Sequence, residues 1–260
     1  MVKNLLFYSG GIGSWMAAKR FTEQTGEKLT LLFADTKIED EDLYRFLSET
    51  VSKLKKTSNI DFFKISEGRT PWQVFEDVKF IGNTRVDPCS RVLKRELMER
   101  WRNQHCDKNV STLIYGIDWT EVNRLEKIKK RLPGWKIKAP MTEPPFFSKK
   151  EMLNELKKED IEIPKLYQLG FPHNNCGGFC VKAGQAQFEL LYRKMPERYA
   201  HHEKQEKETM KKIGTQSTIL RDRRGGKTKP LSLENFRKQI ELKPDSFDKH
   251  EFGGCGCALD

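Results

Sequence analysis

The first 140 residues alternate short apolar runs with longer segments in which apolar residues recur at helical spacing. Four of the runs predict buried strands, at Lys3–Tyr8, Leu29–Ala34, Ile60–Ile65 and Val110–Ile117. Three segments that follow them predict helices, at Trp15–Gln24, Lys37–Lys56 and Glu121–Arg131. Strands separated by helices of this length indicate parallel βαβ units. We therefore expect an α/β fold with an open, mostly parallel, Rossmann-like sheet and helices on both faces.

The strand signal fades after residue 140. Helices are expected at Lys149–Glu159 and Gly184–Arg198, with a Pro/Gly/Asn-rich loop between them, and a further loop is expected at Arg221–Lys229. We therefore expect two parts. They are an α/β domain over residues 1–140 and a smaller helical and loop region over residues 141–260 that carries a cysteine cluster.

Composition narrows the class of protein. The chain has 260 residues, of which 37% are hydrophobic, and its 16 Phe, 5 Trp and 6 Tyr provide enough bulk for a core. No apolar run approaches the roughly 20 residues of a membrane span, and the start lacks a signal-peptide layout. We expect a soluble, cytoplasmic protein with no membrane partner. The net charge of +11 suits a polyanionic partner or a phosphorylated substrate, or else serves solubility alone.

A glycine-rich turn, SGGIGS, connects the first predicted strand to the first predicted helix. Gly10 and Gly11 let consecutive backbone N–H groups point at an anion, and the helix N-terminus adds its partial positive charge. Ser9 and Ser14 can add hydroxyl donors. The turn is neither a Walker A motif nor a GxGxxG motif. It predicts a phosphate site, and an ordinary tight turn between a strand and a helix is the alternative.

The same residues resemble a known family. SGGIGS is similar to the SGGxDS loop of PP-loop ATP pyrophosphatases, in the branch related to phosphoadenosine-phosphosulfate (PAPS) reductases. Further segments resemble that branch in the same order: FADT at Phe33–Thr36, DPCSRVLKREL at Asp87–Leu97, GIDWTEVNR at Gly116–Arg124 and NNCGGFCVK at Asn174–Lys182. The resemblance spans roughly residues 1–200 and implies a ligand site at the carboxyl edge of an open α/β sheet.

The resemblance implies a site for an adenine nucleotide, ATP or a PAPS-like molecule. The residues implied to bind it are Ser9, Gly10, Gly11, Ser14, Asp35, Thr36, Gly116 and Asp118. The residues implied to act in catalysis are Lys94, Arg124 and Asp35. Asp35 and Asp118 are the candidates to hold Mg²⁺ through carboxylate oxygens. The alternatives are a helix cap for Asp35 and a solvated helix face for Lys94, Arg85 and Arg91.

One position departs from the family pattern. Gly13 stands where the SGGxDS loop has Asp. Backbone donors survive this change, whereas a carboxylate that could orient a metal or the loop is lost. The change therefore bears on pyrophosphatase turnover rather than on phosphate binding.

Five of the six cysteines stand in suggestive places. Cys176 and Cys180 lie four residues apart in a glycine-rich loop, and Cys255 and Cys257 lie in the glycine-rich tail. So few cysteines in a cytosolic chain indicate metal or redox chemistry before disulfides. The family counterpart of Cys89 lies beside the later pair, so three thiolates and a fourth from the tail would complete a zinc or [4Fe–4S] site. The resemblance favours iron–sulfur over zinc, and buried thiols without a metal are the alternative.

The late segment Arg221–Lys229 (RDRRGGKTK) carries five basic residues and one acid. This is the composition of a contact with a nucleic-acid backbone, although a solvated surface loop has it too. We expect tRNA or DNA as a partner. Elsewhere, Cys106 is expected to be structural, and His201 and His202 are expected on a solvent-exposed helix face.

Three functions remain open. The first, which we expect, is an adenylating enzyme that splits the α–β bond of ATP and activates an acceptor oxygen, for sulfur insertion into tRNA or DNA with a sulfur donor protein. The second is a sulfonucleotide (PAPS or APS) reductase, for which the family's Glu-Cys-Gly-Leu-His tail is absent and Cys255-Gly256-Cys257 is a loose substitute. The third is a non-catalytic protein that senses nucleotides or binds nucleic acid.

Overall fold

A five-stranded parallel sheet forms the centre of the computed structural model, which describes residues 1–254. Its strands are β1 (Asn4–Phe7), β2 (Leu29–Asp35), β3 (Ile60–Ser66), β4 (Thr112–Ile114) and β5 (Lys136–Lys138). They lie in the order β3-β2-β1-β4-β5, and every neighbouring pair is parallel. The expected α/β fold with an open parallel sheet is confirmed.

Strand β5 at the edge of the sheet is not predicted by the sequence pattern. Two exposed lysines, Lys136 and Lys138, flank the half-buried Ile137. Three residues are too few to show a period of two, and the lysines give the run a polar character. Charged side chains on an edge strand also discourage pairing with another chain.

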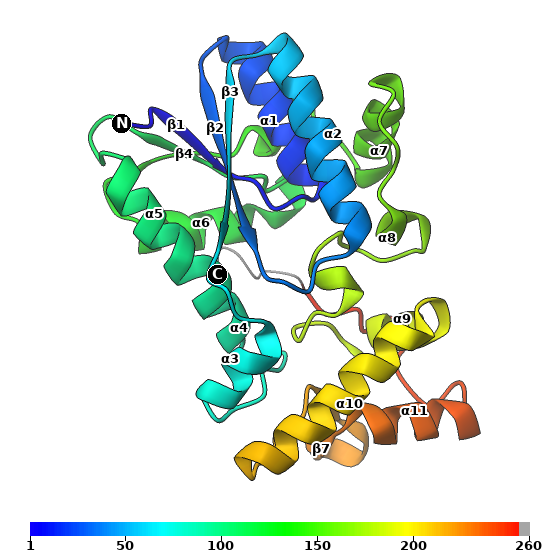
Figure 1. The fold of residues 1–260 in the computed structure, drawn as a ribbon. Coiled ribbons are helices and arrows are strands. Elements are labelled where there is room, and N and C mark those ends of the chain that lie inside the picture. Colours follow the sequence, from blue (N-terminus) through cyan, green and yellow to red (C-terminus); the bar gives the residue numbers. More distant parts are fainter. Residues whose placement is uncertain (255–260) are drawn as a thin grey trace.

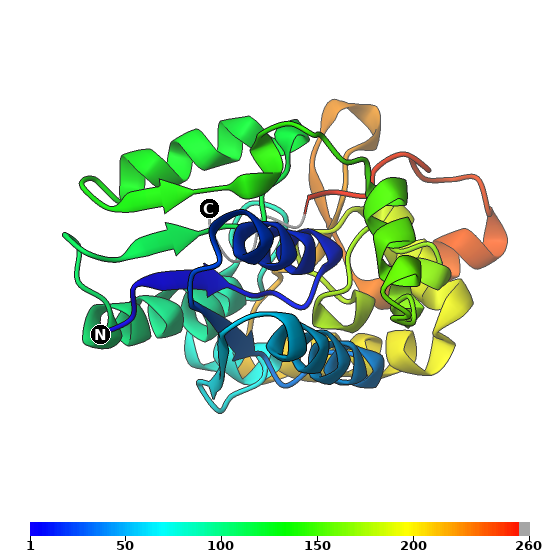
Figure 2. The ribbon, with the colours of Figure 1, turned by 90° about the horizontal axis from the view of Figure 1, so that it is seen from above.

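Helices cover both faces of the sheet, as expected (Figures 1 and 2). One face carries α1 (Ile12–Thr25) and α2 (Glu41–Thr57), and the other carries α5 (Leu97–His105) and α6 (Val122–Arg131). Successive residues of a strand point to opposite faces of a sheet. In β1, Leu6 accordingly packs into the core beneath α1 and α2, and Leu5 packs into the core beneath α5 and α6.

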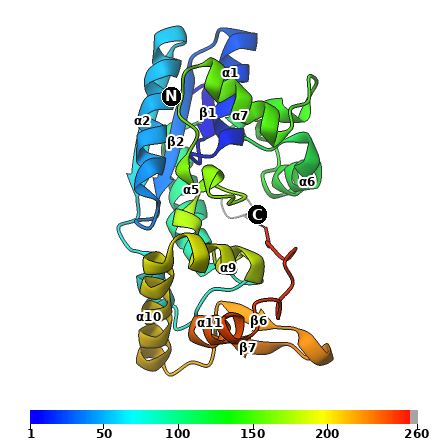
Figure 3. The same ribbon diagram turned by 90° about the vertical axis from the view of Figure 1, so that its right-hand side faces the viewer.

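The last part of the chain lies beyond the carboxyl edge of the sheet (Figure 3). It comprises α9 (Gln185–Lys194), α10 (Pro196–Ile213), the antiparallel hairpin β6 (Leu220–Asp222) and β7 (Lys229–Leu231), and α11 (Leu233–Leu242). Two helices precede it, α7 (Lys149–Lys158) and α8 (Lys165–Gln168). The remaining elements are α3 (Pro71–Asp77), α4 (Pro88–Ser90), the π-helical turn η1 (Arg91–Glu96), and the 3₁₀ turns η2 (Trp119–Glu121), η3 (Pro140–Thr142), η4 (Cys176–Gly178) and η5 (Arg224–Gly226). No helix within residues 1–254 is both long and apolar enough to cross a membrane.

Two local expectations are wrong. Gly184–Arg198 is two helices rather than one, because α9 ends at Lys194 and α10 starts at Pro196, whose ring and missing N–H do not allow the first helix to continue. Arg221–Lys229 is the tip of a two-stranded hairpin rather than a plain loop.

The hydrophobic cores extend across residue 140 in both directions. Met152 and Leu156 of α7 pack into the core beneath α1 and α2. Trp72 and Phe75 of α3, from the first half of the chain, pack with the C-terminal helices. The division into a domain over residues 1–140 and a region over residues 141–260 stays a prediction.

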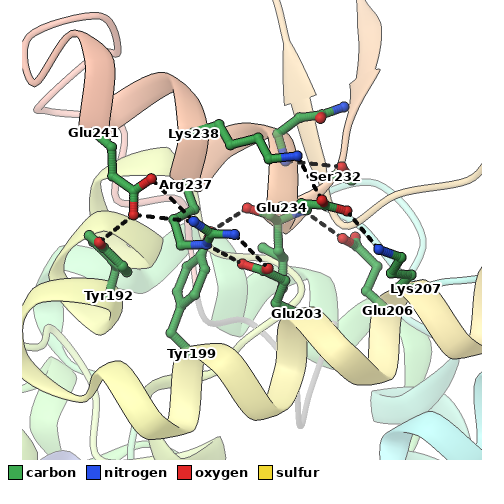
Figure 4. Close-up of polar contacts among 12 residues, drawn as sticks. Tyr192, Tyr199, Glu203, Glu206, Lys207, Ser232, Glu234, Arg237, Lys238 and Glu241 are labelled. Carbon is green, nitrogen blue, oxygen red and sulfur yellow. Dashed lines mark hydrogen bonds and ion pairs between the residues drawn. The ribbon is translucent and has the colours of Figure 1, made fainter.

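Helix α10 carries buried polar side chains that tie the C-terminal elements together (Figure 4). Glu206 accepts hydrogen bonds from the backbone N–H groups of Ile219 (3.0 Å) and Leu233 (2.6 Å). His202 is also buried, and its Nδ1 accepts a hydrogen bond from the indole N–H of Trp72 at 3.1 Å. The expectation that both histidines of the pair are exposed is therefore wrong for His202, because this face of α10 is covered by α3.

Candidate functional site

A cavity of about 350 Å³ opens at the carboxyl edge of the sheet, between the glycine turn after β1 and the segment 167–175. The strand order reverses between β1 and β4, and a crevice at such a reversal is where open α/β sheets bind ligands. Seven of the residues predicted for the site line this cavity: Ser9, Gly11, Ser14, Lys94, Gly116, Asp118 and Arg124.

The glycine turn is held by its own serines. The Ser14 hydroxyl donates to the Gly11 carbonyl at 2.8 Å, and the Ser9 Oγ accepts from the Gly11 N–H at 3.3 Å. Gly10 has a φ of +76° and faces Leu43 rather than the cavity, so its role in the structure is to make the turn. The first-turn N–H groups of a helix have no partner within that helix, and those of Gly13 and Ser14 in α1 border the cavity. An anion bound here would meet both these donors and the positive end of the helix dipole.

Gly13, the position that departs from the family pattern, has a structural reason for lacking a side chain. A Cβ there would lie 2.9 Å from the carbonyl oxygen of Gly116. A Cβ on Gly116 would in turn lie 2.6 Å from the Cα of Ser14. The backbones after β1 and β4 therefore touch, and only glycines fit at the contact.

The segment 167–175 is bonded directly to the glycine turn. The Tyr167 hydroxyl accepts a hydrogen bond from the Ile12 N–H at 3.1 Å. The Asn175 amide donates to the Ser9 carbonyl at 2.6 Å, and the Asn174 amide donates to the Gly10 carbonyl at 3.0 Å. These residues were missed from the sequence, because their partners lie more than 150 positions away. The only signal was the Asn-Asn pair that precedes Cys176.

Three cations reach the cavity from different elements. Arg124 of α6 donates to Glu121 at 2.9 Å. Lys149 of α7 lies 4.5 Å from the centroid of the Tyr167 ring and donates to a backbone carbonyl. Burial lowers the pKa of Lys149 below its ordinary value, and the nearby Asp118 carboxylate opposes that shift. Lys149 was not predicted, because a lysine at the start of an exposed helix carries no pattern of its own.

Lys94, the third cation, lies between this cavity and a second, smaller one, and it lines both. It sits on η1, a π-helical turn of the kind that often marks functional sites. Its Nζ lies 3.7 Å from Oε1 of Glu39 and 3.6 Å from Sγ of Cys176. Glu39 also accepts from the Thr36 hydroxyl at 2.8 Å and from the Cys176 N–H. Burial raises the pKa of the Glu39 carboxyl, against the opposing effect of Lys94.

The two predicted carboxylates lie in different places. Asp118 lines the cavity, and its Oδ1 accepts from the N–H of Thr120 at 2.8 Å. Asp35 is buried outside the cavity lining, where it accepts from the Tyr44 hydroxyl at 2.8 Å and pairs with Lys64 at 3.0 Å. Burial would raise the pKa of Asp35, but these partners and the Lys37 N–H lower it below its ordinary value. The cap of α2 is Asp40 rather than Asp35.

Cys89, Cys176 and Cys180 line the second cavity, which has a volume of about 20 Å³. Cys176 has a φ of +54°, an unusual conformation for a residue with a side chain, and strain of this kind clusters at functional sites. Thiolates suit zinc and iron–sulfur clusters, so these three residues fit such a group in chemistry and in facing one cavity. Within residues 1–254, however, no three Cys, His, Asp or Glu are close enough to bind one metal ion. Cys255 and Cys257 lie outside the described residues.

The remaining candidates lie apart from the site. Arg85 is exposed and does not line the cavity, and Arg91 lines another cavity on the α5 side. Cys106 packs against the core beneath α5 and α6, as a structural residue would. Thr36 lines the cysteine cavity rather than the glycine-turn cavity.

The comparisons with known proteins find solved structures with a similar fold and nothing more specific. No family model matches the chain, and no curated protein matches it. A PAPS reductase from Candida auris, in its phosphate complex, is 11% identical over 66% of this chain and 79% of its own, with a TM-score of 0.44. The U34-tRNA thiolase NcsA from Methanococcus maripaludis, with its [4Fe-4S] cluster, is 15% identical over 100% of this chain and 78% of its own, also with a TM-score of 0.44. Likeness at this level does not bear on activity.

Proposed function

We propose that the chain is an enzyme that binds ATP or a related adenine nucleotide in the cavity of about 350 Å³ and acts at the α-phosphate. The observation that carries the proposal is the convergence of the first turn of α1 with Lys94, Arg124 and Lys149 on one cavity at the reversal of the strand order. Backbone donors and cations together form a phosphate site.

The lining of the cavity includes both apolar and polar residues. Leu32, Phe33 and Ala34, at the carboxyl end of β2, border the cavity and would lie beside an adenine ring. The glycine turn and the cations would bind the phosphates. The α-phosphate is then held near Lys94, between the nucleotide cavity and the cysteine cavity.

The proposed reaction is adenylation. An oxygen of the acceptor attacks the α-phosphorus, the bond from this phosphorus to the bridging oxygen breaks, and pyrophosphate leaves with the electron pair. Lys94, Arg124 and the first-turn amides of α1 would stabilise the negative charge that develops on the phosphate oxygens. Of the two carboxylates predicted for Mg²⁺, Asp118 lines the cavity and would hold the ion, which would neutralise charge on the leaving pyrophosphate.

We propose further that sulfur from a donor protein replaces the adenylated oxygen of the acceptor: a carbon–sulfur bond forms, the bond from that carbon to the oxygen breaks, and AMP leaves with the oxygen. Cys89, Cys176 and Cys180 would hold a [4Fe–4S] cluster or Zn²⁺, with a fourth ligand predicted from the tail. Such a group, when bound, would supply a place to hold sulfur. The positions of these thiols next to Lys94 support the proposal, because they bring sulfur chemistry close to the activated acceptor.

The test measures pyrophosphate release from ATP and ATP affinity by calorimetry. Gly11→Val should abolish ATP binding, since a Cβ at this position lies 3.3 Å from Ser9 Oγ and 3.5 Å from the Tyr167 hydroxyl and larger groups would fill the turn. Arg124→Ala should lower the rate of pyrophosphate release by about tenfold or more. Lys129→Ala, on the exposed face of the same helix, is the control and should change neither.

Unchanged ATP affinity in a folded Gly11→Val variant would reduce the turn to a structural role. Thioredoxin-dependent release of sulfite from PAPS, without pyrophosphate release from ATP, would identify a sulfonucleotide reductase instead. ATP binding without turnover in the holoprotein would favour a nucleotide sensor.

A further inference from the structure

A third cavity, of about 330 Å³, lies on the α5 and α6 face of the sheet, at the carboxyl ends of β1 and β4. Its volume is close to that of the nucleotide cavity, yet no predicted nucleotide-binding residue lines it. Phe7 and Met98 line both cavities, so the two lie side by side with these side chains between them.

The lining of this cavity is rich in arginine. Four arginines contribute to it, Arg91, Arg95, Arg102 and Arg131, against two glutamates, Glu96 and Glu99. The arginines come from η1, α5 and the last residue of α6, so three elements place guanidinium groups around one space. Such a cavity attracts anions, and the planar forks of arginine match the paired oxygens of phosphate.

The existing partners of these arginines balance only part of their charge. Arg95 donates to both carboxylate oxygens of Asp87 at 3.4 Å, so its charge is largely matched. Arg102 is buried and donates to Glu99 at 3.0 Å, so its charge is largely balanced. Arg91 lies 3.8 Å from Glu96, and both side chains are about half exposed, which makes the pair weak. Arg131 makes no hydrogen bond or ion pair with any residue of the described chain, 1–254.

Tyr115, at the end of β4, provides a second and independent sign of a ligand. The residue is 1% exposed and lines this cavity. Its hydroxyl has no hydrogen-bond partner among residues 1–254, and the residue lines the cavity, so a ligand there could accept from this hydroxyl. Burial raises the pKa of Tyr115, so the hydroxyl remains a donor at neutral pH. A donor directed into a cavity beside four guanidinium groups suits an acceptor oxygen that carries negative charge.

We propose that this cavity binds a phosphate group carried by a second ligand, held beside the nucleotide. Arg91 and Arg131 contact the phosphate oxygens, and the Tyr115 hydroxyl donates one further hydrogen bond. The volume exceeds that of a bare ion, so the rest of the ligand occupies the space along Phe7 and Leu132. The assignment of this ligand as the acceptor rests on the proposed function, whereas the phosphate site itself does not.

The test titrates the full-length protein with inorganic phosphate, followed by calorimetry and by ³¹P NMR. The double variant Arg91→Ala/Arg131→Ala removes two exposed charges from the cavity, so it should fold normally. We expect it to weaken one class of phosphate binding by about tenfold or more, and Tyr115→Phe should weaken the same class through loss of the hydroxyl alone. Lys129→Ala/Lys130→Ala removes two exposed charges of α6 that do not line the cavity, and it should leave the phosphate affinity unchanged.

The glycine-turn variant Gly11→Val separates this site from the nucleotide site. Phosphate binding that survives Gly11→Val and is lost in Arg91→Ala/Arg131→Ala supports the proposal, whether or not the protein hydrolyses ATP. Phosphate binding that is lost only in Gly11→Val would overturn it, as would equal effects of the arginine and lysine double variants. A ten-nucleotide single strand and adenosine monophosphate, used as further probes, distinguish a polynucleotide phosphate from a small phosphate ester.

Discussion

The contact between Gly13 and Gly116 shows how one residue type fixes the shape of the site. The family loop has Asp where this chain has Gly13, and here a Cβ would meet the Gly116 carbonyl at 2.9 Å. That carbonyl belongs to backbone and cannot move as a flexible side chain does. The absence of the usual carboxylate is thus matched by a close approach of two strand ends.

Introducing the aspartate of the SGGxDS loop at this position should therefore destabilise the protein. We expect Gly13→Asp to lower the melting temperature and to weaken ATP binding, because the new side chain pushes the first turn of α1 away from Gly116. Differential scanning calorimetry and ATP titration would measure the two effects. A variant with unchanged melting and faster pyrophosphate release would show that the two backbones separate easily and that the missing carboxylate limits turnover.

Glu206, buried in α10, predicts a pH dependence of stability. Burial raises its pKa from 4.5 to about 7, against the hydrogen bonds from the Ile219 and Leu233 N–H groups. Between these pH values the folded chain holds more protons than the unfolded chain, so the contribution of this group to the free energy of unfolding falls as pH rises. In the Glu206→Gln variant the side chain at this position is an amide, which does not titrate. The wild type should lose stability relative to this variant from pH 4.5 to about 7.

Urea unfolding at several pH values checks this prediction. The quantity to follow is the difference in free energy of unfolding between wild type and variant, since a uniform loss from the amide substitution leaves its slope unchanged. Glu208→Gln, at an exposed position of the same helix, should give a flat difference. A flat difference for Glu206→Gln as well would mean that its pKa is ordinary in the folded protein.

At the scale of elements, the short turn η4 lies between the two cavities. It follows Asn175, which lines the glycine-turn cavity, and it begins with Cys176, which lines the cysteine cavity. Cys176, Gly177 and Gly178 have successive φ values of +54°, +56° and +81°. A Cβ on Gly177 would lie 2.7 Å from the Ile38 carbonyl, and one on Gly178 would lie 2.8 Å from the Phe171 ring. The turn is therefore packed closely against Ile38 and Phe171, and it holds the Cys176 thiol beside Lys94.

Cys176→Ser tests the metal site that we propose at this turn. Protein prepared without oxygen should contain iron or zinc, and the variant should lose most of it and become less stable, because metal binding is coupled to folding. Metal analysis, an absorption spectrum and thermal melting measure these outcomes. Cys106→Ser, in the core beneath α5 and α6, should leave the metal content unchanged. A wild type with neither metal would contradict the site.

The hairpin β6–β7 is the element for which we propose nucleic-acid binding. Some of its arginines already have partners, since Arg223 pairs with Glu251 and Arg224 pairs with Asp222. Lys227 and Lys229 are exposed. Replacing both lysines with Ala should weaken RNA or DNA binding for all sequences. It should also reduce the slope of log affinity against log salt by about 0.7 to 0.9 for each phosphate that is no longer neutralised.

The control for the hairpin is Lys55→Ala/Lys56→Ala at the end of α2, which removes the same charge from another part of the surface. ATP affinity should persist in both double variants. Equal losses of nucleic-acid affinity would indicate a general effect of net charge, and no loss at all would leave the hairpin as a solvated tip.

For the whole molecule, the sequence predicts what depends on local pattern and misses what depends on distant contact. Strands β1 to β4 and helices α1, α2 and α6 follow from buried apolar runs and helical spacing, since both are properties of consecutive residues, whereas α3 and α4 were not predicted. Tyr167 and Asn175 bind the glycine turn across more than 150 positions, and Glu39 accepts a hydrogen bond from the Cys176 N–H across 137 positions. Contacts between such distant residues produce no periodic pattern in the sequence. Asp35 carries a family motif, yet its neighbours direct it away from the cavity.

The hydrogen bonds from Asn174 and Asn175 to the glycine turn connect this turn to the segment that carries Cys176. Asn175 holds the Ser9 carbonyl, and the next residue is Cys176. One peptide unit, about 3.8 Å between Cα atoms, therefore separates the residue that binds the glycine turn from a cysteine that lines the second cavity. In the proposed function, a displacement of the glycine turn by a bound phosphate would reach the Cys176 thiol through the Asn175 hydrogen bond and one peptide unit, so that nucleotide binding and the position of this thiol would be coupled.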